Sequence, residues 1–288
     1  MKARIKKRMA AAVAGATAVA ALVVGTPSTS YAAPPSLRAF GISSDGTLMA
    51  TFTTDRPQVL DWFRLITGLS GDTALIGIDY RVQDGLMYGV GNKGGIYTIK
   101  TPPATPDVVV TKVSQLSVAL YGTNFGVDFN PAADRLRVIS DNGQNLRHNL
   151  ADHSTIEDTI LTTPPISGPT RGVTAAGYTN NDLDPNTATT LFDINTTLDQ
   201  VAIQSPANNG TLAPTGNLSL DAGANAGFDI YTDLTNGRAT SFSAFATLTR
   251  AGASTSTLYT VDVLTGSPVS VGQFPVAITD IAIALDTN

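Results

Sequence analysis

The phrase Gly77-Ile78-Asp79-Tyr80 recurs along the chain as Gly126-Val127-Asp128-Phe129 and Gly227-Phe228-Asp229-Ile230. Two weaker copies read Ala175-Ala176-Gly177-Tyr178 and Ile278-Thr279-Asp280-Ile281. Counted at the third position of each copy, the successive spacings are 49, 49, 52 and 51 residues. A period near 50 residues is typical of the four-stranded blades of β-propellers. The phrase therefore predicts five repeated units.

Each period carries the pattern of four short strands. In the first period, 74–81, 86–91, 96–101 and 108–116 are rich in strand-forming residues, and Asp84-Gly85 supplies a hairpin turn. The composition agrees, because 26 Gly, 16 Pro and an acidic set of 22 Asp and one Glu favour turns over helix interiors. We therefore expect a fold with essentially no helix.

The two ends of the chain complete one unit between them. The last copy of the phrase supplies a single strand, 278–285, whereas 37–42, 46–53 and 62–69 match the other three strands of a unit. Closing a ring in this way leaves no unpaired sheet edge between first and last units. We predict an all-β, five-bladed β-propeller, its last blade closed by the N- and C-terminal strands. A β-sandwich or a solenoid is the alternative.

Residues 1–32 have the pattern of a secretory signal peptide, which leaves 33–288 as a single propeller domain. Five basic residues precede an apolar stretch of 17 residues, and Ser30-Tyr31-Ala32 places small residues where a signal peptidase cleaves. The alternative is a membrane anchor, but the stretch is short and consists largely of Ala. We therefore expect a secreted protein with no membrane span after signal removal.

Charge and composition exclude several classes of function. Without 1–32 the chain carries 13 basic and 23 acidic residues, a net charge of −10, which disfavours nucleic acid as a partner. The absence of Cys excludes disulfides and thiol catalysis. There is no G-x-S-x-G motif, and both histidines, His148 and His153, are expected on the surface. The sole Glu157 falls in an outer strand, far from a shared axis.

The repeated aspartates are the main candidate site. Asp79, Asp128, Asp229 and Asp280 occupy one equivalent position in four units, and Gly177 takes that position in the fifth. On innermost strands, these carboxylates would approach a common axis, where they would repel unless a cation, water or backbone amides satisfied them. Two interpretations stay open: a cation or polar-ligand site, or carboxylates that accept neighbouring amides and join the blades.

Three arginines are candidates for anion binding. Arg135, Arg137 and Arg147 concentrate positive charge in one unit of an acidic chain, and the first two share a strand face. The alternative is that they pair with carboxylates such as Asp134 or Asp141.

The chain also resembles a family of bacterial exported proteins, domain of unknown function 4394. The resemblance is carried by the runs 77–81, 85–91, 125–138 and 140–147, of which Phe125 to Val138 is the most distinctive. The family has no established activity or catalytic residues, so the resemblance implies none.

Together these features predict an exported propeller that is a non-enzymatic binding or scaffold module. Its partner would be a small molecule, a glycan or a protein, and we expect a monomer without a cofactor. The alternative is an extracellular hydrolase or lyase with a site at the channel mouth and with calcium as a bound ion.

Overall fold

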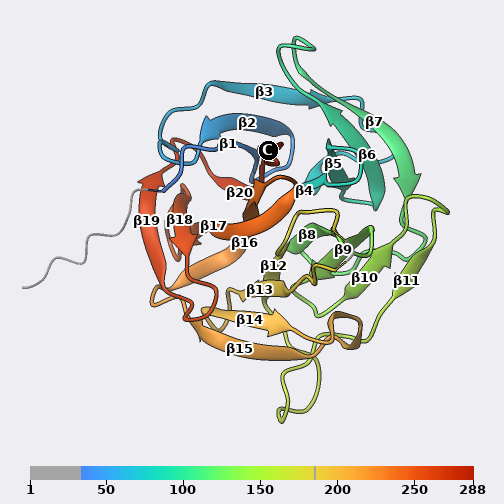
Figure 1. The fold of residues 1–288 in the computed structure, drawn as a ribbon, viewed down its shortest axis with the longest axis vertical. Coiled ribbons are helices and arrows are strands. Elements are labelled where there is room, and N and C mark those ends of the chain that lie inside the picture. The colour runs from blue at the N-terminus through green and yellow to red at the C-terminus, as the bar shows by residue number, and fades with distance from the viewer. Residues whose placement is uncertain (1–33, 185) are drawn as a thin grey trace, which may run out of the picture. The chain divides into compact units, whose positions relative to one another are not determined.

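The copies of the repeated phrase lie on five strands that surround a common centre (Figure 1). Each of these inner strands contacts the next, and the last contacts the first, so the contacts form a closed ring. The phrase thus places its third residue at the centre of the fold in every copy. The inner strands are β4 (Leu75–Arg81), β8 (Phe125–Asn130), β12 (Val173–Tyr178), β16 (Ala222–Thr235) and β20 (Ile278–Ile283).

Three antiparallel sheets of four strands run outward from β8, β12 and β16. Their outermost strands β11, β15 and β19 lie at the periphery in Figure 1. The first sheet adds β9 (Arg135–Ser140), β10 (Asn145–His148) and β11 (Thr155–Glu157). The second adds β13 (Leu191–Asn195), β14 (Gln200–Gln204) and β15 (Leu212–Asn217), and the third adds β17 (Arg238–Arg250), β18 (Thr257–Val261) and β19 (Pro268–Gln273).

The fourth sheet has eight strands in the order β20-β1-β2-β3-β7-β6-β5-β4. Its two halves join where β3 and β7 run parallel over only two residue pairs, Ile66 with Val108 and Thr67 with Val109. At one end, the last strand, β20, pairs with the first, β1, so the first and last strands of the described residues lie side by side as expected. The remaining bounds are β1 (Arg38–Ser43), β2 (Leu48–Thr53), β3 (Trp62–Thr67), β5 (Leu86–Gly91), β6 (Gly95–Lys100) and β7 (Val108–Gln115).

The hydrophobic core lies between neighbouring groups of strands. One buried cluster joins Tyr88 and Ile96 to Phe129 and Val138, and thus packs β5 and β6 against β8 and β9. Four further clusters of the same kind occur around the ring. Since each sheet is covered by apolar residues on both sides, removing this surface from water stabilises the ring of sheets.

The prediction of an all-β fold is confirmed for the described residues, which are 34–288 except residue 185. They form one compact unit, Pro34–Asn288, whose only helical element is the 3₁₀ turn η1 (Ala207–Asn209). No helix in this part of the chain is long and apolar enough to cross a membrane. The expected signal peptide, 1–32, lies outside the described residues.

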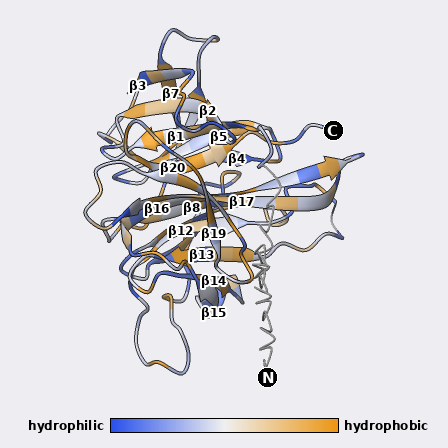
Figure 2. Cartoon of the chain, turned by 90° about the vertical axis from the view of Figure 1, so that its left-hand side faces the viewer, coloured by the Kyte–Doolittle hydropathy of each residue, from blue (hydrophilic) through white to orange (hydrophobic). Residues whose placement is uncertain are grey.

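The β16–β17 hairpin is longer than the repeat predicts. Its strands have 14 and 13 residues, and they turn at Asn236 and Gly237. Figure 2 shows that the hairpin extends toward the side on which the C-terminus lies. There the amide of Gly237 donates to the carbonyl of Asn288 at 3.1 Å. The hairpin and the C-terminal residues therefore build one end of the central axis together.

Candidate functional site

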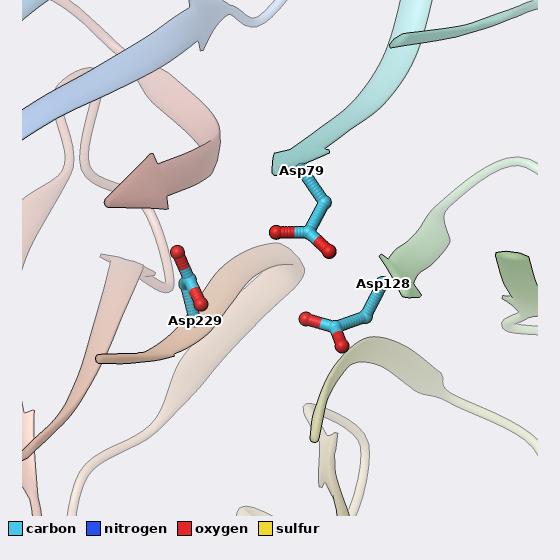
Figure 3. Close-up of side chains that lie close together, drawn as sticks. All are labelled: Asp79, Asp128 and Asp229. Atoms are coloured by element: carbon cyan, nitrogen blue, oxygen red, sulfur yellow. The ribbon is translucent and has the colours of Figure 1, made fainter. Parts of the chain in front are cut away.

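Three of the four repeated aspartates converge at the centre of the ring. One carboxylate oxygen from each of Asp79, Asp128 and Asp229 lies within 4.8 Å of the other two, and all three side chains are buried. Figure 3 shows them pointing toward one another from separate strands. Asp280 is also buried, on β20, but does not belong to this group of three. The group is called the axial carboxylates below.

Each repeated aspartate also accepts a hydrogen bond from the backbone of the next inner strand. Asp79 accepts the Phe129 amide at 2.7 Å, and Asp128 accepts the Tyr178 amide at 3.0 Å. The bonds from Ile283 to Asp229, at 2.5 Å, and from Ile78 to Asp280, at 2.7 Å, repeat this pattern. Gly177 on β12 has no side chain to make the fifth such bond. The carboxylates therefore link neighbouring inner strands as well as facing the axis.

The four aspartates are more difficult to ionise than exposed carboxylates. Burial raises the pKa of Asp229 to about 6. Burial, together with repulsion from Asp229, raises the pKa values of Asp79 and Asp280 well above the usual value. The pKa of Asp128 is raised by burial and then by the charges of Asp79 and Asp229. Without a counter-charge, the axial carboxylates therefore favour protonated forms.

A pocket of about 560 Å³ opens at the end of the axis where the inner strands terminate. Its walls come from the segments that follow β4, β12, β16 and β20. The carboxylate of Asp286 accepts the amide of Leu234 at 2.8 Å, and that of Asp182 accepts the amide of Ala239 at 2.9 Å. These hydrogen bonds hold the walls in place and occupy part of the hydrogen-bond acceptor capacity of the two carboxylates. The apolar side chains of the lining are Tyr80, Val82, Leu183, Leu234 and Leu285.

The opposite end of the axis is much narrower. A hollow of about 120 Å³ lies there, lined by residues at the start of the inner strands such as Leu75, Phe125 and Thr279. Its volume is too small for most ligands, whose pockets span roughly 300–1,000 Å³. We therefore call the larger pocket the channel mouth and take it as the end open to a ligand.

The three candidate arginines do not gather into one anion site. Arg137 is buried and donates to the carboxylate of Asp158 at 2.7 Å, which Arg147 also contacts at 2.6 Å. Arg137 and Arg147 thus pair with a carboxylate, as the alternative expected, although the partner is Asp158 and not Asp134 or Asp141. Arg135 donates to nearby backbone carbonyls. Asp158 thus neutralises much of the positive charge that the sequence concentrates in this sheet.

Asp193 on β13 is a buried carboxylate that sequence reasoning missed as a candidate. Its side chain is fully buried, and neither of its oxygens has a hydrogen-bond partner among the described residues. Burial raises its pKa well above the usual value, although the charge of Arg137 opposes the shift. The sequence contains one indication of this buried carboxylate, because Asp193 is the only polar residue in the apolar run Leu191-Phe192-Asp193-Ile194.

Replacing Asp193 by Asn is expected to stabilise the protein at neutral pH by about 1–3 kcal/mol, because folding must otherwise bury an unsatisfied carboxylate charge or take up a proton to neutralise it. Since the pKa of Asp193 is raised in the folded state, the penalty grows as the pH rises past the ordinary value of 3.8 and disappears below it. Urea unfolding of Asp193→Asn at neutral and acidic pH measures the gain. The exposed Asp107→Asn is the control, and an equal effect of the two substitutions would contradict the expectation.

The histidines do not both lie on the surface. His153 is exposed as expected, but the side chain of His148 is fully buried between β7 and β11, which corrects the sequence interpretation. Burial lowers the pKa of His148 to about 4. The ring contacts Ser114 and Thr155, at 2.9 Å each. The sequence shows no sign of this, because Ser114 lies 34 residues away in the preceding repeat.

The ring of inner strands and the axial carboxylates define an all-β, propeller-like protein. The chain belongs to the family Domain of unknown function (DUF4394), which it matches over residues 48–282 and which the repeated phrase already suggested. Among curated proteins, none matches this sequence.

Several solved structures are similar at low identity. Glutaminyl cyclase from Myxococcus xanthus matches with 11% identity and a TM-score of 0.46 over 79% of this chain and 97% of its own. TolB from Acinetobacter baumannii matches with 9% identity and a TM-score of 0.44 over 87% of this chain and 66% of its own. Hydrazine synthase from Kuenenia stuttgartiensis matches with 10% identity and 0.39 over 70% of this chain, which spans 51% of that one. At such scores these similarities carry no argument about activity.

Proposed function

We propose that the chain is an exported, five-bladed propeller that acts as a binding or scaffold module through its channel mouth. The blade count follows if the eight-stranded sheet is two blades whose outer strands β3 and β7 meet over two residue pairs. Five groups of four strands then match the five inner strands of the ring. Export follows from the pattern of residues 1–32.

The shape and lining of the channel mouth carry the binding proposal. Its volume of about 560 Å³ suits a small ligand, and apolar side chains with a few fixed polar groups are typical of ligand pockets. The lining includes Tyr80, Asp182 and Asp286 but no serine, histidine or lysine. A hydrolase or lyase at this end would need a nucleophile or a base that is free to act, whereas the carboxylates of Asp182 and Asp286 already accept backbone amides. Binding therefore has more support than catalysis at the mouth.

The charge of the mouth limits the ligand class. Asp182 and Asp286 line the pocket, and the mature chain would carry a net charge of −10. A neutral or cationic ligand with an apolar body fits this field, whereas an anion is disfavoured. The class includes small molecules, the apolar faces of glycans, and short protein segments.

Blocking the mouth is expected to abolish the binding of an apolar probe. The neutral dye N-phenyl-1-naphthylamine should bind the protein more tightly than the anionic 8-anilinonaphthalene-1-sulfonate. Val82→Trp, which fills the mouth, should weaken N-phenyl-1-naphthylamine binding by about 10-fold or more, equivalent to about 1.4 kcal/mol. The control Val59→Trp makes the same change at an exposed site outside the mouth. Equal affinities of the two variants in a fluorescence titration would overturn the proposal.

We propose in addition that the axial carboxylates bind a calcium ion. Three carboxylate oxygens within 4.8 Å of one another support this, since hard cations take oxygen ligands and remove the repulsion among them. The ion would link β4, β8 and β16 at the centre and stabilise the ring without taking part in chemistry. Protonation of the same carboxylates is the competing state, and the pH and calcium experiments in the Discussion separate the two.

A further inference from the structure

Ser114 on β7 lies between two imidazole rings of the neighbouring sheet. Its Oγ is 2.9 Å from Nε2 of His148 and 2.9 Å from Nδ1 of His153. Nδ1 of His148 lies 2.9 Å from Oγ1 of Thr155, and this hydroxyl also accepts the amide of Ser117 at 3.0 Å. The arrangement joins β7 to β10 and β11, at the periphery of the ring and far from the axial carboxylates (Figure 1).

The hydrogen-bond chain constrains where the hydroxyl proton of Ser114 points. A hydroxyl donates one proton, and a neutral imidazole has one donor and one acceptor nitrogen. If Nδ1 of His148 donates to Thr155, its Nε2 accepts from Ser114 and His153 donates to Ser114. If Thr155 donates instead, every bond in the chain reverses and Ser114 donates to His153. In both patterns the Ser114 hydroxyl proton faces the lone pair of an imidazole nitrogen.

The surroundings favour the pattern in which His148 accepts this proton. Thr155 already accepts one amide hydrogen, and a hydrogen from Nδ1 of His148 would complete its two acceptor positions. Burial lowers the pKa of His148 to about 4, so the ring is neutral at neutral pH, as both patterns require. Thr155 is then a positioning residue, because it fixes the tautomer and orientation of the ring.

The largely buried Ser114 also lines a hollow that is open to solvent. An open hollow of about 510 Å³ lies over β7 and is lined by Lys112, Val113, Ser114, Gln115 and His153. A nucleophile within hydrogen-bond reach of a base, with a third group that orients the base, is the pattern of nucleophilic catalysis. The hollow gives a small acyl or phosphoryl compound access to the hydroxyl.

We infer that Ser114 is a nucleophile that His148 activates, and that the site takes small carboxylic esters. In this reaction Ser114 Oγ bonds to the acyl carbon and its proton passes to Nε2 of His148. The bond from the acyl carbon to the alcohol oxygen then breaks, and the leaving alkoxide takes that proton. Water then attacks the acyl carbon and gives one proton to Nε2 of His148. The bond from the acyl carbon to Oγ breaks, Oγ takes that proton back, and the carboxylic acid leaves. This activity is separate from ligand binding at the channel mouth.

Diisopropyl fluorophosphate tests the nucleophile directly. It forms a bond from phosphorus to the serine oxygen, the phosphorus–fluorine bond breaks, and fluoride leaves with the bonding electrons. We expect one diisopropylphosphoryl group per folded chain, located on Ser114 by peptide mass spectrometry. Ser114→Ala should take up none. The control Ser43→Ala should label as the unmodified chain does, since Ser43 is equally buried but contacts no histidine.

The neighbouring groups are tested by the rate of labelling. His148→Gln keeps a hydrogen-bonding side chain without a base and should slow labelling about 100-fold or more. His153→Gln should retain most of the rate. Thr155→Val should lower the rate of labelling of the folded protein, and Thr155→Ser, which keeps the hydroxyl, should restore it.

The labelling site decides the proposal even if a variant fails to fold, because it is mapped on the unmodified chain. Hydrolysis of p-nitrophenyl acetate that disappears in Ser114→Ala would support it further. Absence of an adduct on Ser114 would overturn it, as expected if the serine is only structural or if the two histidines hold a metal ion instead. Failure of N-phenyl-1-naphthylamine binding at the mouth would leave this result unaffected.

Discussion

Gly126→Ala is expected to destabilise the protein by about 3 kcal/mol or more, because it inserts a methyl group between two inner strands. A Cβ at this position would lie 2.7 Å from the backbone nitrogen of Ala176 and 2.8 Å from two backbone carbons of Ala175. These atoms belong to β12 itself, so no side chain can rotate away to relieve the contact. The first residue of the repeated phrase is thus glycine because neighbouring inner strands approach closely there.

A second glycine separates this packing effect from backbone strain. Gly252 has a φ of +80° in a turn, with nothing within 4 Å of an added Cβ. Gly252→Ala should therefore cost only the strain of the left-handed conformation, about 1–2 kcal/mol. Urea unfolding of both variants gives the comparison. A smaller loss for Gly126→Ala than for Gly252→Ala would contradict the close approach of β8 and β12.

Acidification is expected to stabilise the protein, in contrast to most proteins. The folded-state pKa of Asp229 is about 6, against 3.8 for an ordinary Asp, so its ionisation destabilises the fold by about 3 kcal/mol above pH 6. The penalty begins as the pH rises past 3.8 and is complete above 6. The raised pKa values of Asp79, Asp128 and Asp280 act in the same direction.

Thermal unfolding measures this dependence on pH. Between about pH 7.5 and pH 5, relief of the Asp229 charge alone amounts to about 1.4 kcal/mol, or a rise of roughly 3–6 °C in the melting temperature. Asp229→Asn keeps an oxygen that can accept the Ile283 amide, and it should reduce the dependence. A melting temperature that falls steadily from neutral to acidic pH would contradict the burial of these carboxylates.

Calcium distinguishes the two ways of neutralising the cluster. If the axial carboxylates bind calcium, about 1 mM of the ion should raise the melting temperature at neutral pH, but not at pH 5, where protons compete. Asp128→Asn should weaken the effect. A calorimetric titration without heat, and without a shift in melting temperature, would overturn the calcium proposal but leave the pH dependence intact.

The repeated phrase predicts the architecture well because it combines local and global requirements. Its glycine permits close packing of inner strands and recurs in three of the five copies, and its aspartate bonds to the next strand and recurs in four of them. The phrase thus located all five inner strands and the axial carboxylates. It did not predict that Asp280 stands outside the group of three, which depends on where each side chain points.

The other polar sites depend on contacts between repeats, which the sequence does not reveal. Ser114 and His148 belong to different sheets, and their meeting depends on how β7 packs beside β10. Arg137 was expected to bind an anion or to pair with a carboxylate such as Asp134 or Asp141, yet Asp158 and Asn145 satisfy it in the interior, where charged residues are seldom found. The channel mouth combines segments that follow four separate strands, so only the folded ring creates it.

A crystal structure of the protein with bound N-phenyl-1-naphthylamine tests the proposed function most directly. Density for the dye is expected in the channel mouth, against Tyr80, Leu234 and Leu285. Density for the dye at another site, with the mouth left empty, would contradict the central claim that this chain binds its ligand at the end of the propeller axis.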